Sequence, residues 1–236
     1  MAISITNLSG GNTPADGSDP RTFPAIWNAT ATDLEGVATD LDTLEATVGA
    51  HDLNSLSGVG ITTPVEGDLL TYNGTSWVNG VPAGSILQVV STTKTDTFSM
   101  TAEDTWTDIT GLSVVITPSS ASSKVSLRVD LGHVDSSVLA GLVFRFVRDS
   151  TPIGIGTDAG SRIAGTFGLI ADTPGRGVTA SGSFVDSPSS TSAIAYKLQT
   201  YSQDTATTLI NRRSADTDST GFLRTVSTIT AMEVAG

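Results

Sequence analysis

The sequence contains no cysteine, has few charged residues and shows no long apolar run. Without cysteine, a disulfide framework, a thiolate metal site and a cysteine nucleophile are all excluded. No apolar stretch approaches the roughly 18 residues of a membrane-spanning helix, so we expect no membrane insertion. Asp and Glu number 24 against 12 Lys and Arg. This acidic balance argues against nucleic acid or an anionic membrane as the main partner.

Basic residues are missing from the whole stretch between Arg21 and Lys94. The composition therefore changes near residue 94, which separates an acidic N-terminal part from a more balanced C-terminal part. Residues 1–22 are rich in Gly, Pro, Asn, Asp and Ser, and we expect them to become ordered only when docked on another protein. The first residues, MAISITNLSGGNT, have neither a basic group nor a long apolar core, so no secretion signal is expected.

Motifs that carry catalysis or metal binding are also absent. The two histidines, His51 and His133, have no partner at metal-ligand spacing, and neither HExxH nor G-x-S-x-G occurs. We expect His51 at the end of a helical seam and His133 packed or solvated on a strand. Three carboxylate pairs could in principle serve glycan cleavage, but solvated turns explain them better. These pairs are Asp40/Asp42, Glu103/Asp104 and Asp216/Asp218. We therefore predict no catalytic residue, no cofactor and no metal site.

A heptad pattern occupies residues 23–51. Apolar side chains recur at positions a and d, which predicts a helix with a narrow seam typical of a parallel coiled coil. The alternative is a single amphipathic helix that packs on its own sheet. Several threonines and Gly36 weaken the helix, so it needs packing partners. The candidate seam residues are Trp27, Leu34, Val37, Leu41, Leu44 and Val48.

The segment EGDLLTYNGTSWVNG, residues 66–80, has the pattern of a β-hairpin. Asn73-Gly74 lies between apolar residues, and such a turn favours positive φ at both central positions. A lone hairpin cannot bury Leu70, Tyr72 and Trp77 by itself. We therefore expect these three side chains to pack against a distant part of the chain or against other copies of it.

From residue 85 to the end, short strand patterns alternate with turns. In KVSLRVDLGHV, residues 124–134, apolar and polar side chains alternate strictly, as in a half-buried strand. The pattern predicts a mainly β protein whose C-terminal domain is an antiparallel β-sandwich, similar to a jelly roll. The expected strands are Ile86–Thr92, Thr97–Thr101, Trp106–Ile109, Leu112–Thr117, Lys124–Val134, Gly141–Arg148, Pro152–Ile155, Val178–Val185, Ala193–Ser202, Thr207–Asn211 and Phe222–Val234.

Aromatic and basic residues of this region divide into core and surface candidates. The alternation places Phe144, Phe146 and Tyr196 in the core. Tyr201 and the turn with Arg212 and Arg213 are candidates for an exposed receptor contact, because sugar-binding surfaces often use exposed aromatic faces, which stack on apolar sugar faces, with polar groups nearby. A plain solvated loop is the alternative for this turn.

One segment resembles a known module. Residues 52–79 are similar to a module common in bacteriophage fibre and other virion appendage proteins, through Asp52, Leu53, Leu56, Pro64, Gly67, Asp68, Leu70, Tyr72, Asn73, Gly74, Trp77 and Asn79. The region 85–236 resembles C-terminal head domains of tail-fibre-like proteins of marine and freshwater phages, through stretches such as ILQVVSTTKTDTFS and STITAMEV. The resemblance implies a trimeric stalk in which three chains share their Trp and Leu side chains.

The resemblance and the pattern together predict a homotrimeric virion fibre, assembled in the cytoplasm of a bacterial host. Residues 1–22 would dock on another virion protein, 23–51 would form a coiled coil, 52–84 an interwoven neck and 85–236 a knob. The leading role is a tail fibre that recognises a glycan or protein of the host surface. The alternative is a capsid head fibre or decoration protein. A glycan-degrading enzyme is a remote alternative, as is a bacterial adhesin.

Overall fold

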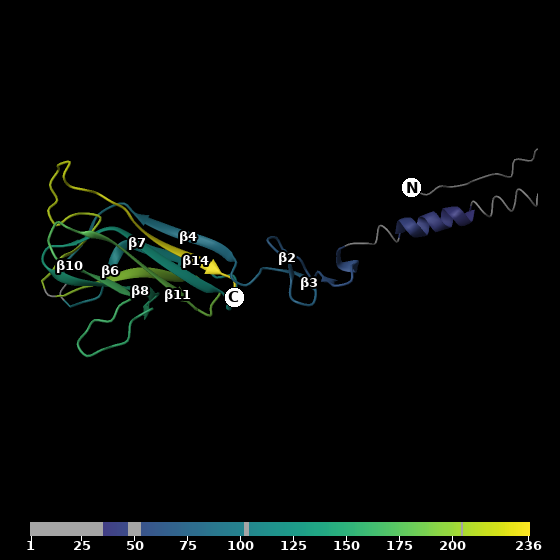
Figure 1. The fold of residues 1–236 in the computed structure, drawn as a ribbon, viewed down its shortest axis with the longest axis horizontal. Coiled ribbons are helices and arrows are strands. Elements are labelled where there is room, and N and C mark those ends of the chain that lie inside the picture. The colour runs from purple at the N-terminus through teal and green to yellow at the C-terminus, as the bar shows by residue number, and fades with distance from the viewer. Residues whose placement is uncertain (1–34, 47–52, 102–103, 204) are drawn as a thin grey trace, which may run out of the picture. The chain divides into compact units, whose positions relative to one another are not determined.

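The computed structural model describes residues 35–46, 53–101, 104–203 and 205–236. The chain divides into two units, Met1–Gly80 and Val81–Gly236 (Figure 1). Among the described residues, no helix is both long and apolar enough to cross a membrane.

The described part of the first unit contains one α-helical segment and a small sheet. Residues 35–46 are helical, and a 3-10 turn, η1, follows at Leu53–Ser55. Three short strands form the sheet in the order β1-β3-β2, with β2 and β3 antiparallel and β1 parallel to β3. Their bounds are β1 Val59–Gly60, β2 Leu69–Tyr72 and β3 Trp77–Gly80.

The predicted hairpin is confirmed, but its turn differs from the expected one. Tyr72 pairs with Trp77, so the loop has four residues rather than two. Gly74 has a φ of 99°, whereas Asn73 is not in the left-handed region. Asn73 instead accepts the backbone N–H groups of Thr75 and Ser76 on its side-chain Oδ1, at 3.0 and 2.9 Å. Asn73 therefore shapes the turn through its side chain, in the manner of an Asx turn.

The described residues of the second unit form eleven strands in two antiparallel sheets. The six-stranded sheet contains β4 Ile86–Lys94, β5 Phe98–Met100, β7 Lys124–Ser136, β11 Val178–Asp186, β13 Thr208–Ile210 and β14 Ser227–Val234. The five-stranded sheet contains β6 Thr107–Ile116, β8 Ala140–Arg148, β9 Thr151–Ile153, β10 Phe167–Ala171 and β12 Ile194–Ser202.

The strand order is that of a jelly roll. One sheet runs β4-β14-β7-β11 and the other β6-β12-β8-β10. Numbered along the chain, these eight strands lie in the orders 1-8-3-6 and 2-7-4-5, which is the arrangement of two Greek keys folded into a sandwich. The short strands β5, β9 and β13 extend the two sheets. The predicted mainly β, jelly-roll-like sandwich is therefore confirmed for this unit.

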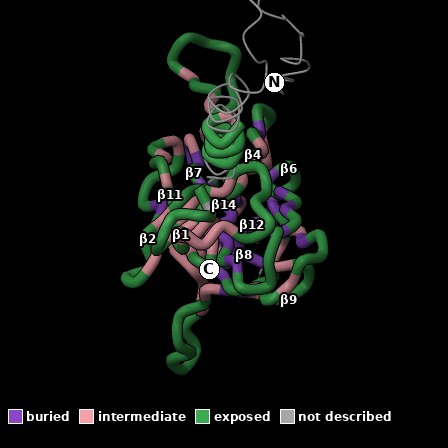
Figure 2. Tube along the Cα trace, turned by 90° about the vertical axis from the view of Figure 1, so that its right-hand side faces the viewer, coloured by how far each residue is buried: buried purple, intermediate pink, exposed green. Residues whose placement is uncertain are grey.

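The core lies between the two sheets (Figure 2). On β7, the side chains of Val125, Leu127, Val129 and Leu131 are at most 1% exposed, as the alternation predicts. The aromatic residues expected in the core are also there, because Phe144, Phe146 and Tyr196 are fully buried. The inner faces of both sheets contribute to one hydrophobic cluster.

Three strand predictions are wrong in detail. The two strands expected at Trp106–Ile109 and Leu112–Thr117 are one strand, β6, because Gly111 adopts a φ of 85° and lets the strand continue through a bulge. The strand expected from Phe222 begins only at Ser227. The sequence also gave no sign of β10, whose pattern FGLIA is short and contains Gly168.

Candidate functional site

Among the described residues, nothing covers the apolar stripe of the helical segment. The side chains of Val37, Leu41 and Leu44 are 56%, 50% and 61% exposed. Their spacing of four and three residues places them on one face of the helix. The other predicted seam residues, Trp27, Leu34 and Val48, lie outside the described residues, as do His51 and the docking segment 1–22. The described part of the seam is therefore available to a partner.

The hairpin presents a second apolar surface. Leu70, Tyr72 and Trp77 share one face of the small sheet, and their side chains are 44%, 57% and 47% exposed. The rings of Tyr72 and Trp77 lie 5.6 Å apart between centroids, and the Tyr72 hydroxyl donates to the carbonyl of Gly74 at 3.0 Å. About half of the surface of each of these two aromatic residues is thus exposed to water. Exposed apolar surface of this kind marks a contact site for a partner.

Polar contacts, rather than burial, hold the small sheet in shape. Asn79 donates from Nδ2 to Oδ2 of Asp68 at 2.7 Å and to the carbonyl of Thr62 at 3.0 Å. Its Oδ1 accepts the N–H of Thr62 at 2.8 Å, and Asp68 also accepts the N–H of Val65. The sequence singled out Asp68 and Asn79 only through the resemblance, and the structure gives them this physical role. Asn79 pairs with Leu70, so this polar cluster lies on the same face of the sheet as the apolar side chains.

The expected receptor contact at Tyr201 is not an exposed aromatic. Tyr201 is 8% exposed, its ring lies 5.4 Å from that of Trp106, and its hydroxyl donates to Asp104 at 2.7 Å. The expectation of exposure is wrong because Tyr201 belongs to the outer face of β12, where Trp106 and Asp104 cover it. The alternation alone could not reveal this cover.

The two arginines of the expected contact turn are only partly exposed. Arg213 donates to the carbonyls of Gly175 and Gly221 at 2.9 Å, and its guanidinium lies 5.0 Å from the centre of the Phe222 ring. Arg212 is 3.5 Å from Asp216. Both guanidinium groups therefore brace the loops around them, and neither is a freely projecting cation.

The outer face of the five-stranded sheet contains a network that sequence reasoning missed. The guanidinium of Arg145 lies 4.0 Å from the centre of the Trp106 ring and donates to Gln199 at 2.8 Å. Gln199 and Lys197 both donate to Asp108, each at 2.7 Å. Burial raises the pKa of Asp108, but these two hydrogen bonds outweigh it and hold the pKa below its ordinary value. The polar groups of this network satisfy one another, so it needs no ligand.

His133 lies in a buried polar region at the end of β7. It is 6% exposed, and its Nε2 has no hydrogen-bond partner among the described residues. Burial lowers the pKa of His133, so the ring is neutral near pH 7. Neighbouring Asp135 is fully buried and accepts the backbone N–H groups of Gly175 and Ser214. Of the two alternatives for His133, packed or solvated, the structure shows the packed one.

No metal or catalytic cluster is evident in the part of the chain that the structure describes. Within it, no three His, Asp or Glu side chains gather as a metal ion would require. The predicted absence of a metal site and of catalytic residues stays a prediction for the chain as a whole.

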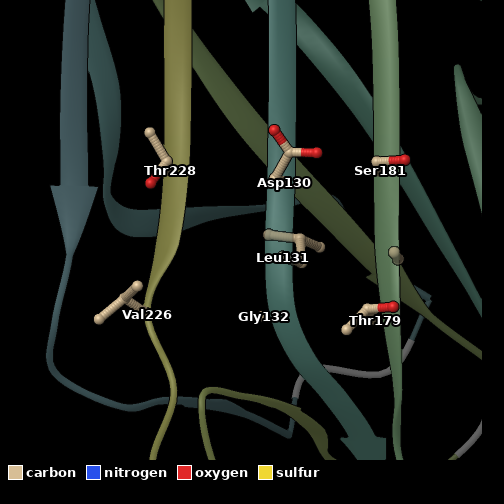
Figure 3. A pocket seen from close by; sticks show the side chains of 8 residues that line it. Asp130, Leu131, Gly132, Thr179, Ser181, Val226 and Thr228 are labelled. Atoms are coloured by element: carbon tan, nitrogen blue, oxygen red, sulfur yellow. The ribbon is translucent and has the colours of Figure 1, made fainter.

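The outer face of the six-stranded sheet is rich in hydroxyl groups and contains a shallow depression (Figure 3). Its volume is about 400 Å³. Residues of β7, β11 and β14 surround it together with Val226 just before β14, and none is aromatic. The lining residues are Asp130, Leu131, Gly132, Thr179, Ala180, Ser181, Val226 and Thr228. The sequence did not single out this surface, because its members come from three strands far apart in the chain.

Comparisons with known proteins give only distant likenesses. No protein-family model and no curated protein matches the chain. Among solved structures, the chain is similar to the VP2 subviral particle of infectious bursal disease virus, at 16% identity and a TM-score of 0.31, over 71% of this chain. It is also similar to the Gx strain of infectious bursal disease virus, at 14% identity and a TM-score of 0.32, over 73% of this chain. The chain spans 42% of the length of each of these two proteins. Likeness at this level leaves the fold assignment to the strand order described above.

Proposed function

We propose that the chain is a homotrimeric structural protein of a phage virion, a short fibre with an N-terminal attachment segment and a C-terminal jelly-roll knob. The observation that carries this proposal is the pair of uncovered apolar surfaces in the first unit, on the helix and on the hairpin. Two surfaces of this kind, one after the other in a chain that also contains a sandwich with its own core, are typical of a stalk completed by further copies.

The size of the uncovered surface is compatible with self-association. Complete burial of a large apolar side chain contributes about 1.5–3 kcal/mol, so covering the exposed half contributes on the order of 1 kcal/mol. The helix and the hairpin each offer three such residues (Val37, Leu41, Leu44 and Leu70, Tyr72, Trp77). The free energy gained by covering these six side chains is comparable with the cost of association, about 4–15 kcal/mol. The predicted continuation of the seam through Trp27, Leu34 and Val48 would add the excess that a stable stalk needs.

The number of copies rests on the resemblance of residues 52–79 to modules of trimeric stalks. A heptad seam alone also fits two or four strands. Acidic residues flank the seam almost exclusively, so pairing by interhelical ion pairs is not available, and the apolar seam has to set the assembly. Three copies give one shared core for the helix and for the aromatic pair of the hairpin.

Within the virion, the proposed role is a tail fibre whose knob contacts the host surface. Residues 1–22 attach the fibre to another virion protein, and the knob acts by binding rather than by catalysis. The second candidate is a capsid head fibre or decoration protein. Both roles need the same order of anchor, stalk and knob.

Immunogold labelling of intact virions tests this proposal directly. An antibody is raised against the second unit, and an unrelated antibody of the same class serves as control. Label at the tail supports the tail fibre, and label over the capsid supports the head fibre. Purified virions without label, while the same antibody detects the chain in the infected lysate, contradict a place in the virion.

A further inference from the structure

The depression on the outer face of the six-stranded sheet has a definite structural origin. The pairing of β11 with β7 is interrupted by a bulge between Val178 and Ala180, which turns Thr179 toward the depression. Opposite this bulge, Gly132 has no side chain, and a Cβ there would come within 2.2 Å of the carbonyl oxygen of Val226. The segment around Val226 therefore passes close to β7 and forms one wall.

Polar groups form a row across three neighbouring strands. Thr228 on β14, Asp130 on β7 and Ser181 on β11 occupy paired positions, and Figure 3 shows them side by side. Within the described residues, the hydroxyls of Thr179 and Ser181 have no hydrogen-bond partner in the protein, and that of Thr228 has only a long contact of 3.5 Å to Thr93. These hydroxyls can therefore donate to and accept from a ligand.

The carboxylate of Asp130 is held in place by Arg128. Nε of Arg128 donates to Oδ2 at 2.7 Å and Nη2 donates to Oδ1 at 3.0 Å. The two side chains are 62% and 51% exposed, so both also face solvent. Each carboxylate oxygen keeps a free lone pair, while the guanidinium neutralises its charge. The site is thus oriented, rich in hydrogen-bonding groups and close to neutral.

The chemistry of this row selects among ligand classes. A metal ion needs several oxygen ligands of negative charge, and the single carboxylate here is already paired. An anion would meet the acceptor oxygens of Asp130. An uncharged polyol offers hydroxyls that both donate and accept, and its C–H groups can lie against Val226, which is 52% exposed. The volume of about 400 Å³ is within the range of small-molecule sites, roughly 300–1,000 Å³.

We propose that this depression is a binding site for an uncharged sugar residue, with Asp130, Ser181 and Thr228 as the hydrogen-bonding groups. The site is open and lacks an aromatic platform, so a single sugar binds weakly, in the millimolar range typical of a few hydrogen bonds, roughly 1 mM or weaker. Several knobs on one particle would compensate by multivalency. Only this multivalency rests on the proposed fibre, because the binding of one sugar residue by one knob depends neither on the number of copies nor on their place in the virion.

Saturation-transfer NMR on the full chain tests the site. The probes are glucose, galactose, mannose and N-acetylglucosamine, each added alone at millimolar concentration. The test variant is Ser181→Val with Thr228→Val, which removes two lining hydroxyls and keeps residues suited to strands. The matched control is Ser183→Val with Thr230→Val. These positions lie two residues further along the same strands, on the same face, opposite Arg128 and outside the depression.

The proposal expects saturation transfer from at least one sugar to be preserved in the control and reduced about tenfold in the test variant, since two hydrogen bonds are lost. Thermal unfolding shows whether both variants keep the fold. Absence of transfer from all four sugars, or equal transfer in the two folded variants, overturns the site. A change of oligomeric mass in the test variant, without any sugar binding, assigns this face to contact between copies and likewise overturns it. The mass of the unmodified chain is measured separately, so failure of the sugar site and failure of the fibre proposal are distinguishable.

Discussion

The hydroxyl of Tyr196 donates to Oδ2 of Asp186 at 2.7 Å and thereby joins the two sheets of the sandwich. Tyr196 is on β12 of the five-stranded sheet and Asp186 ends β11 of the six-stranded sheet. Arg148 donates to both oxygens of the same carboxylate at 3.0 and 2.9 Å. Burial raises the pKa of Tyr196, and the bond to Asp186 raises it further, so the phenol stays protonated at any ordinary pH. Because the buried carboxylate of Asp186 accepts hydrogen bonds from Tyr196 and Arg148 on the other sheet, it fixes the position of the two sheets relative to each other at this point.

We expect Tyr196→Phe to destabilise the sandwich by about 1.5–3 kcal/mol, because a buried carboxylate loses a donor. Denaturant unfolding followed by fluorescence measures the change. Tyr72→Phe is the control, since the hydrogen bond of its hydroxyl to the carbonyl of Gly74 is exposed to solvent, and a change within about 0.5 kcal/mol is expected there. Equal effects of the two substitutions would contradict the role given to the bond between the sheets.

The lowered pKa of Glu233 predicts that the free energy of unfolding depends on pH. Burial raises its pKa, but hydrogen bonds from Gln88 and Ser119 outweigh burial and lower the pKa from the ordinary 4.5 to about 2. Because the folded-state pKa is depressed, this stabilisation is fully present above pH 4.5 and is lost as the pH falls toward 2.

Glu233→Gln isolates this contribution from those of the other carboxylates. At pH 7 the variant should be less stable than the unmodified chain by about 1–3 kcal/mol, since its amide cannot accept both sets of hydrogen bonds. The difference should shrink between about pH 4.5 and pH 2. Unfolding curves at several pH values measure it, and a difference that does not vary with pH would disprove the assignment.

Because the two sheets pack closely at Gly182, we predict that a residue with a side chain destabilises the sandwich there. A Cβ on Gly182 would lie 2.2 Å from the ring of Phe167, which itself stacks on Phe144 at 5.0 Å. Gly182→Ala should therefore destabilise the sandwich by about 1–3 kcal/mol through overpacking. Gly221→Ala is the matched control, because a Cβ there meets nothing within 4 Å. If thermal unfolding gives the same midpoint for both variants, the ring of Phe167 moves aside freely and the prediction fails.

Local sequence patterns predicted the buried side chains correctly where the alternation within a single strand is enough to identify them. The alternation of Val125 to Leu131 depends only on the two-residue period of β7, so it was readable. The sequence did not show that the two expected strands join at Gly111, because the junction depends on a bulge in the pairing of β6 with β12. The jelly-roll order itself rests on pairs such as Tyr196 with Arg148, which are distant in sequence and follow no local rule.

Prediction of the contact residues was less successful for the same physical reason. Tyr201 is covered by Trp106, nearly a hundred residues earlier in the chain, and no local signal announces that contact. The depression around Gly132 likewise needs the approach of Val226 and the bulge at Thr179. In contrast, the described apolar residues of the helix and hairpin are exposed, as expected for a short helix and a small sheet with little interior, and their burial by other copies stays a prediction.

The most direct test of the account is the mass of the intact chain in solution, measured by sedimentation equilibrium at micromolar concentration. Three copies of the 24.1 kDa chain are expected. Replacing Leu41 and Leu44 with Asp should shift the mass toward one copy, while the control Thr39→Asp with Asp40→Asn changes exposed positions of the same helix outside the predicted seam and should keep three. A monomeric mass for the unmodified chain would contradict the shared stalk, and with it the proposed fibre.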